Sequence, residues 1–235
     1  MDEFSYIFEL FALLLGLAVA EMLGGFGQVL KLRARRKAVE ASPQLRFRQA
    51  QDERTSSDPA RPELVEGPSA SVRVGWLVPL LGLLVLVDLA TFWAGLWMAR
   101  HGLHMSMLTV FCVLGLIGGY YLVATQVFPD RPEQWPDFDA WYRQQKRFVV
   151  LGILIINVLS QAIVLALGAI AQPTAEQMAA HPVFAVASLL ALLVFPAFVW
   201  LAFSKRDRVD IALIVFIIAT QFFYAWAALD MPGLE

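Results

Sequence analysis

The sequence predicts an all-α membrane protein, a single integral membrane domain over residues 1–235 with six transmembrane helices. Hydrophobic residues make up 59% of the chain and charged residues only 16%, which is too apolar for a soluble domain with a polar exterior. Six apolar runs are each long enough to span about 30 Å of hydrocarbon, and each should be a helix because a helix satisfies its own backbone in lipid. The expected helices cover about 4–30, 76–99, 105–128, 147–171, 182–204 and 210–229.

The first apolar run has a signal peptide as its competing interpretation. Ala18, Val19 and Ala20 resemble a small-residue cleavage site after an apolar stretch. The preceding segment, MDEFSYIFE, contains acids and no Lys or Arg, whereas the start of a secretory signal is basic. We therefore expect the first helix to remain in the mature protein.

The orientation of the helices follows from the connections between them. All Lys and Arg residues except Arg100 lie in the connections between helices 1 and 2, 3 and 4, and 5 and 6. Basic connections stay in the cytoplasm, so both termini are predicted to be periplasmic.

Residues 42–70, in the connection between helices 1 and 2, are predicted to be a disordered cytoplasmic insertion. The segment is polar and Pro-rich, has mixed charge, and lacks helical or strand periodicity. Its pieces RQAQDERTSS and RPELVEGP resemble peptides translated from interspersed palindromic repeats of bacterial genomes, which implies a mobile-element insertion. A docking motif is the functional alternative.

The connection between helices 3 and 4, FPDRPEQWPDFDAWYRQQKRF, has the pattern of a short helix. Acids lie near its start and basic residues near its end, which suits the helix dipole. Aromatic residues gather on one face, which predicts a short interfacial helix before helix 4 that is anchored by Trp135, Phe138, Trp141 and Tyr142. A gate or a partner surface is the alternative function of this segment.

The two outer connections carry weaker signals. Thr174 and Gln177 fit a capping box and predict one exposed helical turn between helices 4 and 5. His101 and His104 are one turn apart and could share a metal ion. Because no third ligand lies in sequence reach, we expect them to be solvated and expect no metal site.

Polar residues occur at one depth in four of the helices. Asp88 lies midway between Trp76 and Arg100, which places it near the centre of the bilayer. Counting from the ends of helices 1, 4 and 6 gives nearly the same depth for four more polar residues, Glu21, Asn157, Gln161 and Gln221. A carboxylate facing lipid is unfavourable by about 2.5 to 3.5 kcal/mol, so these side chains are expected to point inward. On helix 1, Gly16, Ala20 and Gly24 form a row of small residues suited to close helix contact.

Two interpretations of this polar layer stay open. No Lys or Arg lies inside the apolar runs, so the acids are protonated, share a proton, or bind a cation. In the functional interpretation, an exchangeable proton or small cation lies between Glu21 and Asp88, and the amides supply further oxygens. In the structural one, protonated acids and amides hydrogen-bond across helices, each bond contributing about 0.6 kcal/mol.

The sequence argues against several classes of protein. Cys112 is the only cysteine, so a disulfide within the chain and a cysteine-based metal cluster are excluded. No nucleotide-binding loop, zinc-protease motif, serine-nucleophile elbow or haem-ligating histidine pair is present. We expect neither an enzyme nor a cofactor. The expected partners are the lipid bilayer and a second copy or another membrane protein, with no nucleic acid.

Three segments carry a resemblance to a known group of proteins: FELFALLLGLAVAEMLGG, VRVGWLVPLL with DLATFW, and VFPDRPEQWPDFDAWY with KRFVV. Together they resemble a group of small, uncharacterised, multi-pass bacterial inner-membrane proteins. The resemblance implies a location in the bacterial cytoplasmic membrane and no particular activity. Two functional classes follow from the whole sequence: a small proton- or cation-linked transporter or channel, and a non-transporting membrane scaffold or regulatory subunit.

Overall fold

The computed structural model describes residues 3–41, 75–99, 106–129, 137–167 and 175–228. Every regular element in these ranges is a helix: α1 (Glu3–Ala41), α3 (Leu77–Ala99), α4 (Met107–Thr125), α5 (Phe138–Leu167), α6 (Ala175–Ala180), α7 (Pro182–Phe203) and α8 (Asp207–Ala228). Six of these helices, all except α6, are long and apolar enough to cross a membrane. The prediction of an all-α protein with six membrane-spanning helices is confirmed at this level.

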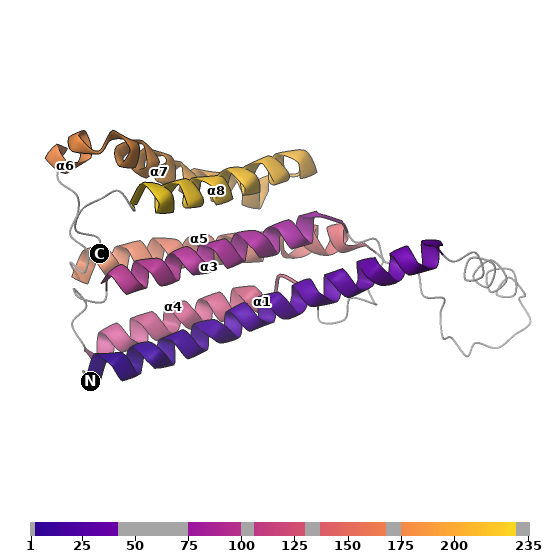
Figure 1. Ribbon diagram of the computed structural model, residues 1–235, viewed down its shortest axis with the longest axis horizontal. Coiled ribbons are helices and arrows are strands. Elements are labelled where there is room, and N and C mark those ends of the chain that lie inside the picture. The colour runs from indigo at the N-terminus through magenta and orange to yellow at the C-terminus, as the bar shows by residue number, and fades with distance from the viewer. Residues whose placement is uncertain (1–2, 42–74, 100–105, 130–136, 168–174, 229–235) are drawn as a thin grey trace, which may run out of the picture.

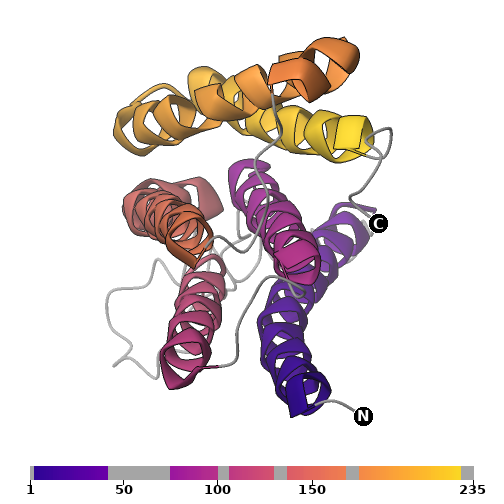
Figure 2. The ribbon, with the colours of Figure 1, turned by 90° about the vertical axis from the view of Figure 1, so that its left-hand side faces the viewer.

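The six long helices form three layers of two, with α1 beside α4, α3 beside α5, and α7 beside α8 (Figures 1 and 2). The central helix is α3, which packs against α1, α4, α5 and α8. In its most apolar window 56% of the residues are buried inside the protein, against 22 to 39% for the other five long helices. The apolar window of α3 is therefore more enclosed by protein than that of any other long helix.

Helix α1 packs along a single apolar stripe with heptad spacing, formed by Phe11, Leu15, Ala18, Met22, Gly25 and Val29. A glycine is required at position 25 because α1 lies close to Phe128 there, and a Cβ atom would meet the ring of Phe128. At 1.5 Å per residue this 39-residue helix is about 58 Å long, and its last turns extend beyond the end of the other helices (Figure 1). It continues through the basic sequence RARRKAVEA, well past the predicted end at residue 30.

The segment predicted to be a separate interfacial helix is continuous with α5, which begins at Phe138 and not near residue 147. Phe138 and Tyr142 are 1% and 0% exposed and belong to the core, so both rings pack on protein. Trp141 is half-buried and donates a hydrogen bond from Nε1 to the carbonyl of Val127 at 3.1 Å. A position of this helical turn at the membrane interface stays a prediction.

The remaining predictions about connections have different outcomes. Helix α6 confirms the expected helical turn before α7. Residues 42–70, His101, His104 and Trp135 lie outside the described residues. The start of α1 and the end of α8 lie at the same end of the bundle (Figure 1). The assignment of that end to the periplasm stays a prediction.

Candidate functional site

Asp88 lies midway along the central helix α3 and is 1% exposed. Its neighbours in sequence are apolar and mostly buried, so the backbone of α3 carries the carboxyl group into the middle of the protein. The carbonyl of Asp88 also accepts a hydrogen bond from the Thr91 hydroxyl at 2.8 Å.

The carboxylate of Asp88 accepts hydrogen bonds from three other helices. Oδ2 accepts from the Tyr120 hydroxyl on α4 at 2.7 Å. Nδ2 of Asn157, on α5, lies 3.1 Å from Oδ1 and 2.9 Å from Oδ2. Nε2 of Gln221, on α8, donates to Oδ1 at 2.8 Å. Each carboxylate oxygen therefore accepts two bonds, and one side chain joins four helices from all three layers.

The donors around Asp88 are all neutral. Within the described part of the chain, Asp88 forms no ion pair with a Lys, Arg or His. A negative charge at this position is therefore stabilised by oriented dipoles alone. One of these donors, Tyr120, packs its ring against Phe92 of α3 at a centroid distance of 4.9 Å. Such a carboxylate can gain a proton without leaving a buried cation unpaired.

The same network can accommodate a protonated Asp88. The two ends of a side-chain amide are exchanged by rotation, and a hydroxyl both donates and accepts. Oε1 of Gln221 is buried and has no hydrogen-bond partner among the described residues. Rotation of that amide presents Oε1 to Oδ1 of Asp88, where it can accept the carboxyl proton. Asn157 keeps a second acceptor in either state, the Ile153 carbonyl at 3.1 Å.

The structure brings together Asp88, Asn157 and Gln221 of the predicted polar layer, but not Glu21 or Gln161. Both of these side chains are exposed on the outer surface of the bundle, which corrects the expectation that they point inward. The physical reason on α1 is the apolar stripe: Met22 and Gly25 of that stripe face the protein, which turns the adjacent Glu21 outward. The row of Gly16, Ala20 and Gly24 is also exposed and makes no close contact within the chain.

Tyr120 is the residue of this site that the sequence did not identify. Counting residues along helix 3 gives the depth of a Cα atom, and the Cα of Tyr120 lies past the middle of α4, toward its C-terminal end. The side chain is long enough for the hydroxyl to reach the depth of Asp88. A useful signal in the sequence would have been Gly119, the residue before Tyr120. In the structure, α4 approaches Ile156 of α5 closely at this glycine.

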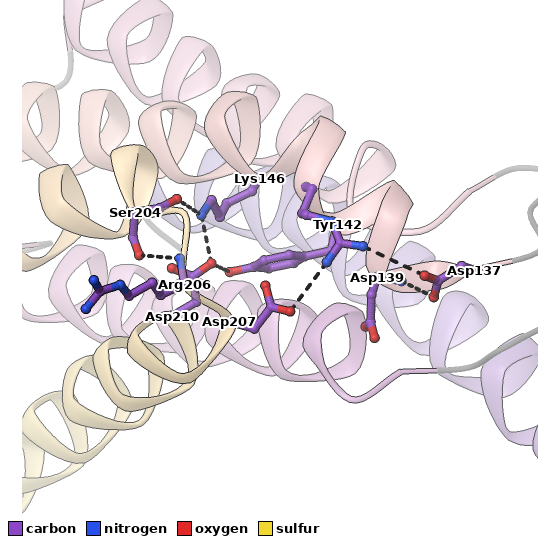
Figure 3. Close-up of polar contacts among 9 residues, drawn as sticks. Asp137, Asp139, Tyr142, Lys146, Ser204, Arg206, Asp207 and Asp210 are labelled. Carbon is purple, nitrogen blue, oxygen red and sulfur yellow. Dashed lines mark hydrogen bonds and ion pairs between the residues drawn. The ribbon is translucent and has the colours of Figure 1, made fainter.

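A second buried polar cluster lies at the end of the bundle where α5 and α8 begin (Figure 3). Nζ of Lys146 lies 2.7 Å from Oδ2 of Asp210 and donates to the Ser204 carbonyl at 2.6 Å. The Tyr142 hydroxyl donates to the same Oδ2 at 3.1 Å. The side chains of Lys146 and Asp210 are 6% and 2% exposed. The sequence placed Lys146 near the end of the short helix expected before helix 4, and it did not predict that this side chain is buried in an ion pair with Asp210.

Exposed polar contacts surround this cluster. Arg143 on α5 pairs with Asp207 on α8 at 3.4 Å and lies 3.8 Å from Asp137. Next to the start of α3, the Arg33 guanidinium of α1 stacks over the Trp76 ring at 3.9 Å and donates to the Gly75 carbonyl. Exposed pairs contribute at most about 1 kcal/mol each, so the buried pair dominates the electrostatics of this end.

No known protein family, curated protein or solved structure matches the chain. Evidence for function therefore comes from the chemistry of the two polar clusters.

Proposed function

We propose that the protein is a small proton-linked transporter of the bacterial inner membrane, in which Asp88 binds and releases the proton. The observation that carries this proposal is the carboxylate of Asp88, fully buried on the central helix and held only by neutral donors. Ionisable residues at this depth are costly and often mark proton or ion pathways.

The hydrogen-bonding capacity of the site supports reversible protonation. In the charged state all three donors point at the carboxylate. In the neutral state, rotation of the Gln221 amide supplies an acceptor for the new O–H group, while Tyr120 and Asn157 keep donating to the other oxygen. The carboxyl group is then hydrogen-bonded in both states, which is what repeated loading and release of a proton requires.

A proton fits this site better than a metal cation does. A hard cation is bound by several oxygen ligands, typically six or more for Ca²⁺ or Mg²⁺. Here one carboxylate meets two N–H groups and one O–H group that already point at its oxygens. Glu21 and Gln161, which would have supplied further oxygens, lie on the outer surface.

The second candidate is a non-transporting scaffold or regulatory subunit. It is favoured by the same four-helix contact, since the bonds to Asp88 also tie the three layers together. The two candidates differ in one respect: a scaffold needs the hydrogen bonds, whereas a transporter needs the change in charge.

The test is proton flux into proteoliposomes loaded with a pH-sensitive dye, under an imposed K⁺ diffusion potential. The parent protein should acidify the lumen faster than empty vesicles, and Asp88→Asn should reduce the rate to that of empty vesicles. Asp207→Asn is the matched control, because it makes the same change in the exposed pair with Arg143 and should leave the flux unchanged. Retention of the parent flux by Asp88→Asn would refute the proposal, as would a parent rate equal to that of empty vesicles.

A further inference from the structure

The two buried polar clusters are in register along two helices. Lys146 and Asn157 lie on α5, Asp210 and Gln221 lie on α8, and the offset from 146 to 157 equals the offset from 210 to 221. Because Lys146 contacts Asp210 while Asn157 and Gln221 both contact Asp88, the two helices run in the same direction. The ion pair therefore lies about 16 Å along the helices from the level of Asp88.

Most of the buried side chains between these two levels are aliphatic in the parts of the chain that the structure describes. The residues that fill this layer belong to one continuous core and are each 0 or 1% exposed: Leu81, Leu84 and Val85 on α3, Val150 and Ile153 on α5, and Ile214 and Ile217 on α8. A close-packed aliphatic layer offers no hydrogen-bond partner to water or to a proton. In the arrangement observed, Asp88 is therefore sealed from this end of the protein.

The Lys146–Asp210 ion pair holds the layer of α7 and α8 against α5, next to these aliphatic side chains. Through Lys146, α5 holds the carboxylate of Asp210 at the start of α8 and the carbonyl of Ser204 at the end of α7 (Figure 3). Lys146 therefore connects α5 to both helices of the α7–α8 hairpin, at the turn between them. At the other polar level, the bond from Gln221 to Asp88 joins the hairpin to α3.

The pair is also built so that it can open. Oδ1 of Asp210 is buried without a hydrogen-bond partner in the described parts of the chain. A buried carboxylate oxygen with no partner is unfavourable, and exposure to water relieves it. The closed arrangement is consequently less stable than a fully satisfied network would be, which favours reversible opening.

We propose that the Lys146–Asp210 pair is a gate that controls access from this end of the protein to the proton site at Asp88. The gate opens when the α7–α8 hairpin separates from α5, which admits water into the aliphatic layer. The role of this gate rests on the proposed function, whereas the separation of the hairpin from α5 can be measured without measuring proton flux.

The experiment measures the rate at which a water-soluble thiol reagent labels a cysteine in the aliphatic layer. The reporter is Ile214→Cys in a Cys112→Ala background, reconstituted into vesicles. The test variant combines Lys146→Met with Asp210→Asn, which removes both charges and leaves no buried ion unpaired, so folding is retained. We expect labelling to rise by about tenfold or more, because the variant removes the charged hydrogen bonds from Lys146 to Asp210 and to the Ser204 carbonyl at the turn of the hairpin.

Three comparisons make the result decisive. Asp210→Glu keeps the charge pair and should keep labelling slow, and Asp207→Asn, which removes only the exposed contact with Arg143, should also keep it slow. Asp88→Asn should leave the labelling rate unchanged while it abolishes flux, so a failure of the gate is distinguishable from a failure of the proton site. Labelling of the charge-free double variant within twofold of the parent would overturn the proposal, and so would an equal increase in Asp207→Asn.

Discussion

Substitution of Asp88 by leucine and by asparagine should have very different effects on stability. Leucine removes the acceptor shared by three donors, of which the Tyr120 hydroxyl is buried and the Asn157 and Gln221 amides are partly buried. Asn157 keeps its bond to the Ile153 carbonyl, but the Tyr120 hydroxyl and the Gln221 amide lose their acceptor. An unsatisfied buried donor costs about 1 to 3 kcal/mol, so two of them cost about 2 to 6 kcal/mol. Hydrogen bonds between membrane helices average only about 0.6 kcal/mol, which favours the lower end, about 2 to 3 kcal/mol.

Asparagine keeps the shape of the side chain and one acceptor oxygen. Its amide group can donate to Oε1 of Gln221, which otherwise has no partner among the described residues. The free energy of unfolding of Asp88→Asn should therefore stay within about 1 kcal/mol of the parent.

The measurement is the free energy of unfolding in bicelles, determined by steric trapping for the parent and both variants. Thr91→Val is the matched control one turn along α3, because it removes a hydroxyl bonded to the Asp88 backbone and leaves the carboxylate network intact. Combining Asp88→Leu with Gln221→Leu should recover part of the loss, since it removes one of the stranded donors. Equal stability of Asp88→Leu and Asp88→Asn would refute the view that these donors depend on the carboxylate.

Two further predictions concern packing and orientation. Gly25→Ala should lower the free energy of unfolding by about 1 to 3 kcal/mol, because the new Cβ meets the Phe128 ring, whereas Gly24→Ala, in open space, should be neutral by the same assay. In a Cys112→Ala background, Thr55→Cys should resist a membrane-impermeant thiol reagent applied from the periplasm, since the connection that contains it is rich in basic residues. Labelling of that cysteine in intact cells would reverse the predicted orientation.

The sequence predicted the helices and their depths better than it predicted their faces. Length and apolarity are enough to locate six spans, and counting along them placed Asp88, Asn157 and Gln221 at one level, where the structure joins them. The face that each helix turns toward the protein was harder to predict. Lipid and the protein interior are both apolar, so the inward face of a helix differs little in composition from its outward face. On α1 the polar side chain of Glu21 suggested the inward face, while the packing of Gly25 against Phe128 decided it.

The second cluster was missed for a different reason. Lys146 stands among basic residues near the predicted start of a helix, which is a pattern typical of a cytoplasmic connection. Its partner Asp210 lies 64 residues away in sequence, and nothing local to either residue indicates the pairing. Contacts of this kind depend on how the hairpin of α7 and α8 docks, which the pattern of a single helix does not determine.

The hydrogen bonds to Asp88 also have a consequence for the order in which the protein is synthesised and assembled. The aspartate enters the membrane with α3, but its partners follow 32, 69 and 133 residues later in the chain, with Gln221 the last to be synthesised. At about 5 to 20 residues per second, roughly 7 to 27 s pass between the synthesis of Asp88 and that of Gln221. During that interval the carboxyl group lies in the bilayer with an incomplete set of donors, so an early intermediate is less stable than the finished bundle. A chain truncated before α8 would keep this defect permanently and present a buried acid that membrane proteases and chaperones can recognise.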